Sequence, residues 1–144
     1  MINIREMTIE DVPKVIQIGS KEDSFSVTPT SSGFWTNKQI SNSIESKNDA
    51  LFVAEENNEI VGFTIALLHK PTGKATLENL WVHQDYRGKG VGKQLIEKTL
   101  GQLKNNGCVY VCSLTKDNNE SMISLFDKVG FNKGYNFFWM DKFL

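Results

Sequence analysis

The sequence predicts a mixed α/β fold, with a central, mixed and mostly antiparallel sheet of roughly six to seven strands flanked by about four helices. Short apolar runs separated by tight turns follow one another between residues 51 and 82, which is typical of an antiparallel meander. A glycine-rich stretch, a long amphipathic segment and another apolar run come next, and this order is typical of a parallel strand-helix-strand crossover. Together they predict one mixed sheet with helices on its faces.

The length and charge predict one ordinary domain at residues 1–144. A chain of 144 residues is long enough to bury a sizeable core. Its 16 basic and 17 acidic residues give a net charge of −1, so nothing favours nucleic acid or an anionic membrane as a partner. The longest apolar runs are far shorter than the roughly 20 residues that span a bilayer. We therefore expect a cytoplasmic protein that binds neither nucleic acid nor membrane.

The N-terminal residues predict a short strand followed by a helix. Ile2 and Ile4 alternate with polar residues, as in a half-buried strand. Thr8, followed by Asp11, resembles an N-cap. The helix that follows has one inner face, made by Val12, Val15, Ile16 and Gly19.

A loop and a second short helix are expected before the meander. Residues Ser20–Gly33 are rich in Ser and Thr and show no period, so they predict an irregular loop of the kind that often holds a substrate site. Thr36 can cap the next helix. Phe34 and Trp35, just before this cap, either anchor the core or form a wall of a substrate pocket.

Three strands joined by tight turns form the predicted meander. Leu51–Glu55 and Glu59–Leu68 flank an Asn-Asn pair, and asparagine tolerates the positive φ angles that a tight hairpin turn requires. A second turn at Pro71–Gly73 leads into the strand Ala75–Val82. The meander therefore delivers the chain directly to the glycine-rich stretch.

The second half of the chain predicts helices and strands in alternation. In order, these are a helix at about Gly90–Asn106, a strand at Cys108–Leu114, a helix from Asn118 or Asn119 to Gly130, and an aromatic strand at Tyr135–Phe143. Cys108 and Cys112 share a predicted strand at a separation of about 13 Å, which is too far for a disulfide. We expect two small buried thiols without chemistry.

The glycine-rich stretch predicts an anion site. Gly88, Gly90 and Gly92 lack Cβ atoms, so several backbone N–H groups can converge on one ligand at a helix start, which adds a partial positive charge. The P-loop pattern G-x-x-x-x-G-K-S/T does not fit, because it needs wider glycine spacing and a hydroxyl residue where Gln94 stands. A dinucleotide fingerprint is also disfavoured, since its third glycine would fall at Lys93.

The stretch resembles the coenzyme A loop of the GNAT N-acetyltransferase superfamily, whose pattern is Q/R-x-x-G-x-G/A. Arg87, Gly90 and Gly92 match this pattern. The resemblance implies that the loop amides hold the pyrophosphate of acetyl-CoA and that the preceding strand lines the pantetheine arm. The implied cofactor residues in these two segments are Leu80, Trp81, Val82, Arg87, Gly88, Lys89, Gly90, Val91 and Gly92.

A second motif of the same family follows at residues 119–131, and the order of predicted elements resembles the GNAT fold over essentially the whole chain. In the family an asparagine contacts the pantetheine arm and the helix ends in Gly-Phe, which Asn119, Gly130 and Phe131 reproduce. Many members carry a tyrosine that protonates the departing thiolate, whereas this chain has Phe126 at that position. The resemblance thus adds Asn119 and Phe126 to the implied cofactor residues. It also implies that the chain lacks the usual acid that protonates the departing thiolate.

The resemblance implies that an acetyl group moves from the thioester to a primary amine by direct attack in a ternary complex. A protonated amine must first lose a proton, so a carboxylate acting directly or through water is useful. Glu78 is the candidate catalytic base, because its L-E-x-x-x-V context resembles that of polyamine acetyltransferases. The alternative is an outward-facing strand glutamate. Tyr135 and Tyr110 are the candidate substitutes for the missing acid.

The acceptor and the class of function stay open. A small amine such as a polyamine is slightly favoured over a protein N-terminus or a lysine side chain, because the glutamate and tyrosine of ribosomal-protein acetyltransferases fall at Leu114 and Phe126 here. A non-catalytic module that binds CoA or acetyl-CoA as a sensor or partner is the alternative from another class. No metal is expected, and the family suggests a homodimer.

Overall fold

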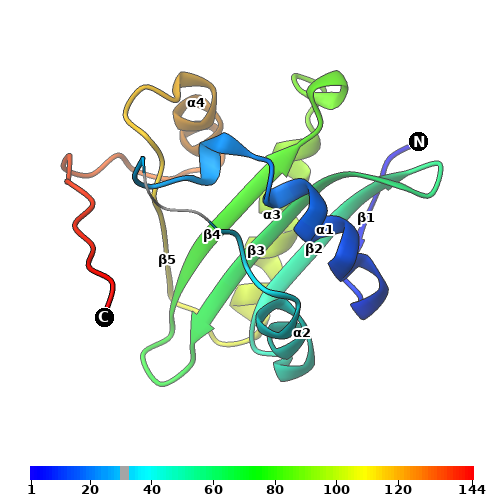
Figure 1. The fold of residues 1–144 in the computed structure, drawn as a ribbon, viewed down its shortest axis with the longest axis horizontal. Coiled ribbons are helices and arrows are strands. Elements are labelled where there is room, and N and C mark those ends of the chain that lie inside the picture. The colour runs from blue at the N-terminus through cyan, green and yellow to red at the C-terminus, as the bar shows by residue number, and fades with distance from the viewer. Residues whose placement is uncertain (30–32) are drawn as a thin grey trace.

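The structure, a computed structural model, describes residues 1–29 and 33–144 (Figure 1). Residues 30–32, which belong to the predicted loop Ser20–Gly33, lie outside the described residues. In chain order the elements are β1 (Asn3–Glu6), α1 (Val12–Gly19), α2 (Asn37–Ser46), β2 (Ala50–Glu56), β3 (Glu59–His69), β4 (Lys74–Val82), α3 (Val91–Asn105), β5 (Tyr110–Ser113) and α4 (Glu120–Lys128).

The strands form one sheet in the order β1-β2-β3-β4-β5. Neighbouring strands are antiparallel except β4 and β5, which are parallel, as a crossover through α3 requires. Helices α1 and α2 cover one face and α3 covers the other, while α4 lies beyond the C-terminal end of β5 (Figure 1). This mixed sheet, flanked by helices, confirms the predicted fold class. None of the described helices has the length and apolar character needed to cross a membrane.

The described part of the chain has five strands in its sheet, fewer than expected, because the strand predicted at Tyr135–Phe143 is wrong. After α4 the described residues form neither helix nor strand, and residues 132–144 are exposed. The apolar pattern favours an extended segment, but a strand also requires a hydrogen-bonding neighbour, and no described strand pairs with this segment. The expectation of two buried thiols is also wrong, because Cys112 lies on β5 at the uncovered edge of the sheet and is exposed. Both cysteines are free thiols.

Local signals set the ends of several elements as expected. The Thr36 hydroxyl accepts the backbone N–H of Gln39 at 3.2 Å and caps α2. Asn57 and Asn58 adopt φ angles of 52° and 63°, which build the tight turn between β2 and β3. Gly107 follows α3 with a φ of 94°, the left-handed conformation that ends many helices.

The core has two layers because alternate residues of a strand point to opposite faces of the sheet. The layer under α3 contains Leu77, Leu95, Ile96 and Leu103. The layer under α1 and α2 contains Val12, Val15, Phe63 and Ile65.

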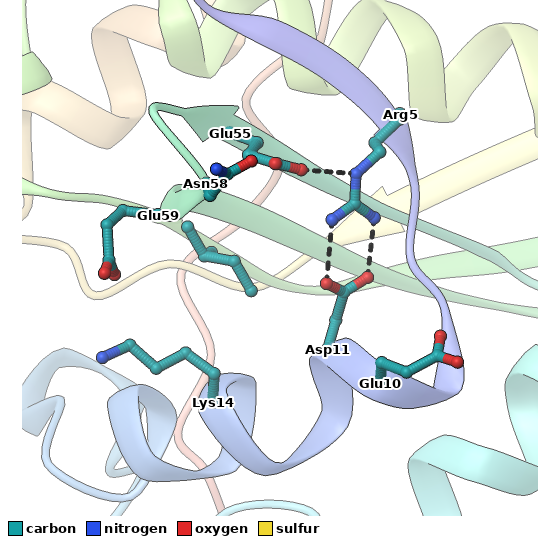
Figure 2. Close-up of a pocket in the computed structure, with 8 residues that line it drawn as sticks. Arg5, Glu10, Asp11, Lys14, Glu55, Asn58 and Glu59 are labelled. Carbon is teal, nitrogen blue, oxygen red and sulfur yellow. Dashed lines mark hydrogen bonds and ion pairs between the residues drawn. The ribbon is translucent and has the colours of Figure 1, made fainter.

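Arg5 ties β1 to β2 and to the start of α1 (Figure 2). Its Nη1 and Nη2 donate to the Asp11 carboxylate at 2.7 and 2.9 Å, and its Nε donates to Glu55 at 2.6 Å. Burial raises the pKa of Asp11, yet the hydrogen bonds from Arg5 and Thr8 hold that pKa below its ordinary value. These groups line a hollow of about 300 Å³, where their charges pair with one another. The cluster therefore serves as a structural clamp.

A buried pair of hydroxyl groups links α3 to β3. Thr64 Oγ1 and Thr99 Oγ1 lie 2.7 Å apart, and both residues are 0% exposed. Thr99 donates its only hydroxyl hydrogen to the carbonyl oxygen of Leu95 at 2.8 Å. Thr64 must therefore be the donor within the pair.

The donor direction predicts unequal effects of two similar substitutions. Thr99→Val should lower the free energy of unfolding by about 1–3 kcal/mol, because it leaves the Thr64 hydroxyl buried without an acceptor. Thr64→Val should cost less, since the Thr99 hydroxyl keeps its bond to Leu95, and the double variant should resemble Thr64→Val. Urea unfolding measures all three variants. Equal losses for the two single substitutions would contradict the assigned direction.

Candidate active site

Strands β4 and β5 separate halfway along β4. Their pairing covers Lys74–Leu77 and Tyr110–Ser113, and at the last pair the Ser113 hydroxyl donates to the carbonyl oxygen of Leu77 at 2.8 Å. Strand β4 continues to Val82 and pairs there with β3 alone. In the described part of the chain, the backbone groups of residues 78–82 that point away from β3 thus have no strand partner. Such groups can pair with an extended ligand.

Glu78 lies at a β-bulge where this gap opens. The register between β3 and β4 shifts from the pair Ala66–Leu77 to the pair Ile65–Asn79, which leaves Glu78 as the extra residue. Its carboxylate forms no hydrogen bond or ion pair with any described residue. Although the residue as a whole is exposed, neighbouring atoms exclude part of the water around the carboxyl, and this desolvation raises its pKa. An unpaired carboxylate of raised pKa suits a general base.

The glycine loop presents free N–H groups beyond the end of β4. Gly88 and Gly90 have φ angles of 73° and 83°, and Gly90 is the N-cap of α3. The first helical hydrogen bond runs from Gln94 to the carbonyl oxygen of Gly90 at 3.1 Å. Within the described ranges, the backbone N–H groups from Gly88 to Lys93 consequently have no acceptor. This loop can cradle an anion at the helix start.

Two basic side chains flank the loop in different ways. Arg87 Nε donates to the carbonyl oxygen of Val82 at 2.8 Å, so the guanidinium holds the loop against the end of β4. Lys89 is exposed, and its Nζ lies 5.5 Å from the centre of the Tyr86 ring. Lys89 therefore remains able to reach a phosphate, whereas Arg87 already has a structural task.

Helix α4 brings the second motif close to the start of α3. A Cβ on Gly92 would lie 3.0 Å from Leu125 Cδ2, so this glycine lets the two helices approach. Asn119 caps α4 by accepting a helix N–H at 3.2 Å through Oδ1, which leaves its Nδ2 free to donate to a ligand. Phe126 is half-buried and its ring centre lies 4.8 Å from that of Phe131.

The connection between α1 and α2 packs on β4 beside Glu78. Trp35 Nε1 donates to Asn79 Oδ1 at 2.7 Å, which fixes the residue next to the bulge. Phe34 anchors the core, because its ring fills the space where a Cβ on Gly19 would lie at 2.5 Å. Of the two uses expected for these aromatics, the core fits both, and Trp35 in addition bonds the residue that follows the candidate base.

The structure keeps both substitute acids away from the gap. Tyr110 pairs with Lys74 at the opposite end of the β4–β5 ladder, and Tyr135 is 91% exposed in the C-terminal segment. Lys116 Nζ, in the loop after β5, donates to the carbonyl oxygen of Asp23 at 3.4 Å. This bond joins the β5–α4 loop to the α1–α2 connection.

Sequence reasoning missed three contributors to this site. The bulge at Glu78 depends on the register with β3, and the Trp35–Asn79 and Ser113–Leu77 contacts join residues distant in the sequence. None of these leaves a local sequence pattern.

Comparison with known proteins identifies the family. The model of the acetyltransferase (GNAT) family matches residues 19–131. The ribosomal protein bS18-alanine N-acetyltransferase of Haemophilus influenzae is 36% identical over 78 residues, which cover 54% of this chain and 51% of that relative. This match therefore spans about half the length of the curated relative.

Solved structures with bound coenzyme A or an analogue share the fold. The structure of AAC(6')-Iy in complex with the bisubstrate analog CoA-S-monomethyl-acetylneamine has a TM-score of 0.77 at 20% identity, over 100% of this chain and 99% of that one. The PaiA N-acetyltransferase of Thermoplasma acidophilum in complex with coenzyme A has a TM-score of 0.76 at 20% identity, over 92% and 90% of the two chains. From the match to the family model and the shared fold, we conclude that this chain belongs to the acetyltransferase (GNAT) family.

Proposed function

We propose that this chain transfers the acetyl group of acetyl-CoA to a primary amine within a ternary complex. The observation that carries this proposal is the gap between β4 and β5, which has the unpaired Glu78 carboxylate where it opens and free N–H groups beyond the end of β4. The names of its relatives include N-acetyltransferases that act on a ribosomal protein and on aminoglycosides, which supports the same class of reaction.

The residues around the gap fit acetyl-CoA. The N–H groups from Gly88 to Lys93 would hold the pyrophosphate, with Lys89 near enough to add positive charge. The pantetheine arm is extended and carries amide groups, so it can pair with the backbone edge at residues 80–82, where only the Val82 carbonyl oxygen already has a donor among the described residues, Arg87. Asn119 Nδ2 would donate to the same arm. Acetyl-CoA supplies the activated acetyl thioester, and the proposal requires no metal.

Glu78 would remove a proton from the acceptor amine, directly or through a water molecule. A lysine-like amine with a pKa of about 10.4 is mostly protonated at neutral pH and cannot attack a carbonyl carbon in that form. The raised pKa of Glu78 makes its carboxylate a stronger base than an ordinary glutamate. A free backbone N–H of β4 can stabilise the oxyanion that forms on attack. A departing thiolate with a pKa of about 8.5 can leave without an acid and take a proton from water.

A small amine such as a polyamine is the favoured acceptor. The basis is that the glutamate and tyrosine used by ribosomal-protein acetyltransferases fall at Leu114 and Phe126 here. A protein N-terminus or a lysine side chain is the second candidate, which the name of the Haemophilus influenzae relative supports. We further propose a cytoplasmic location and a homodimer.

A module that binds CoA or acetyl-CoA without turnover is the alternative from another class, and Phe126 supports it because the leaving-group acid is absent there. Thiol release from acetyl-CoA, measured across polyamines, aminoglycosides and a peptide with an N-terminal alanine, separates the two. An acetyltransferase should release thiol at a rate that rises with the concentration of at least one of these amines. Saturable CoA binding without acceptor-dependent thiol release by any amine would contradict turnover and identify a sensor.

Phe126→Tyr should raise kcat, because it places a hydroxyl where many members of the family carry the acid. The gain should reach up to roughly 10²-fold, the lower end of general-acid contributions, if departure of the thiolate limits turnover. Phe131→Tyr is the matched control, since it adds a hydroxyl to the other ring of the same aromatic pair. Steady-state kinetics at saturating acetyl-CoA measure the effect. An unchanged kcat for Phe126→Tyr would show that thiolate departure is not limiting.

A further inference from the structure

Glu78 has no strand partner that fixes its own position in the sheet. As the extra residue of the bulge, it lies outside the pairs that join β3 to β4. Strand β5 pairs with β4 only as far as Leu77. The direction of the Glu78 side chain therefore depends on how firmly its two neighbours in the chain, Leu77 and Asn79, are held.

Leu77 is held from β5. Its side chain is 2% exposed and belongs to the core layer under α3. Its carbonyl oxygen accepts the Ser113 hydroxyl at 2.8 Å, at the last pair between the two strands. This oxygen belongs to the peptide unit that joins Leu77 to Glu78, and a peptide unit is planar. The bond from Ser113 therefore fixes the peptide plane that leads into the bulge.

Asn79 is held from the connection between α1 and α2. Its Oδ1 accepts the indole N–H of Trp35 at 2.7 Å, and an indole N–H can only donate, so the amide oxygen must face Trp35. Trp35 packs against the core layer under α1 and α2. The next residue, Thr36, forms a capping box with Gln39 through bonds of 2.8 and 3.2 Å. Trp35 is therefore itself held in place and can fix the residue that follows the bulge.

We propose that Trp35 and Ser113 are positioning residues for Glu78, an assignment that rests on the proposed function of Glu78 as the base. Each holds one side of the bulge, so that the carboxylate keeps one direction toward the reacting amine. Neither side chain has to touch the substrate. The two bonds come from elements on different sides of β4 in the fold, which join the base to both β5 and the α1–α2 connection.

Removal of either bond should slow the reaction. Trp35→Phe keeps an aromatic ring without the indole N–H, and Ser113→Ala removes the hydroxyl. Each should lower kcat/KM for the preferred amine by roughly 10- to 100-fold with an unchanged KM for acetyl-CoA, since a misplacement of about 1 Å can cost 10²-fold. Trp139→Phe and Ser46→Ala are the matched controls, because each removes an exposed bond of the same kind outside the site, and both should keep the wild-type rate.

The Glu78→Gln background separates positioning from a general loss of structure. A residue that acts only through the Glu78 carboxylate has nothing left to position once that carboxylate is gone. Trp35→Phe and Ser113→Ala should therefore lower kcat/KM in the wild type and have almost no effect in Glu78→Gln. Equal losses in the two backgrounds, or an unchanged rate for both single variants, would overturn the assignment.

Two substitutions of Asn79 test the bond from Trp35 at its other end. Asn79→Asp keeps an oxygen that accepts the indole N–H, whereas Asn79→Leu has a similar size and no acceptor. Asn79→Leu should lose as much as Trp35→Phe. Asn79→Asp should keep its rate at high pH and lose activity at a higher pH than the wild type on acidification, because the added negative charge raises the pKa of Glu78 further. Equal losses at high pH would contradict the positioning.

The pKa of Glu78 provides a measurement that does not depend on turnover. Desolvation raises this pKa without a contribution from a charged described residue. If loss of either bond loosens the bulge, water should reach the carboxyl and its pKa should fall toward that of an ordinary glutamate. Carbon-13 NMR of the carboxyl group measures this in Trp35→Phe and Ser113→Ala. A pKa that stays raised in both variants overturns the positioning, whereas a fall in a chain that transfers no acetyl group supports it and refutes only the proposed function.

Discussion

Glu78→Gln should lower kcat/KM by roughly 10²–10⁴-fold while the affinity for CoA stays unchanged. The substitution keeps the size and polarity of the side chain but removes its basicity. Because the Glu78 carboxylate forms no hydrogen bond or ion pair with a described residue, its loss should not disturb the bulge or the gap. Steady-state kinetics with the preferred amine measure the loss, and calorimetry with CoA checks the binding.

The pH dependence of activity distinguishes a general base at Glu78 from a residue with a purely structural role. Desolvation raises the pKa of Glu78, so the wild-type carboxylate becomes protonated, and activity falls, as the pH drops through that raised value. At high pH more of the amine is already neutral, so the difference in kcat/KM between the wild type and Glu78→Gln should become smaller. Glu59→Gln, at an exposed glutamate in the β2–β3 hairpin, is the matched control and should behave as the wild type. A Glu78→Gln variant with wild-type activity across pH would remove the base assignment.

Gly90→Val should weaken CoA binding by roughly 10- to 100-fold, because loss of one charge-assisted hydrogen bond costs about 1.5–3 kcal/mol. Among the described residues other than its two neighbours, a Cβ there would meet no atom closer than 3.9 Å, so its main effects are to occupy the space above the loop and to strain a φ of 83°. The strain would also move the N–H groups that converge on the anion. Calorimetry with CoA measures the loss.

Gly107→Val separates cofactor binding from backbone strain. Gly107 has a φ of 94° and open space around its Cβ position, but it lies at the other end of α3. Both variants should lose some stability, whereas only Gly90→Val should lose affinity for CoA. Unchanged affinity in a folded Gly90→Val chain would contradict the cofactor site.

Local patterns predicted the parts of the site that depend on local physics. The hairpin turn, the Thr36 cap and the glycine N-cap of α3 arise within a few residues, and the structure has each where the sequence placed it. The residues proposed to bind the cofactor and the proposed base Glu78 lie on β4, the glycine loop, the start of α3, and α4 with its N-cap.

Features set by pairing between distant strands could not be predicted. The bulge that singles out Glu78 depends on how β4 aligns with β3, and the length of the gap depends on where β5 stops pairing with β4. The same limit explains the error at Tyr135–Phe143. Its apolar pattern is typical of a strand, but a strand also needs a hydrogen-bonding neighbour, which the local pattern does not specify.

Amide NMR during a titration with CoA tests most directly whether the cofactor occupies the gap and the glycine loop. The largest shifts should fall at residues 80–82 and 88–93 and at the Asn119 side-chain amide, while Arg5 and its clamp at the far edge of the sheet stay unchanged. Saturable binding with shifts confined to other residues, or no binding at millimolar CoA, would contradict a cofactor site between β4 and β5.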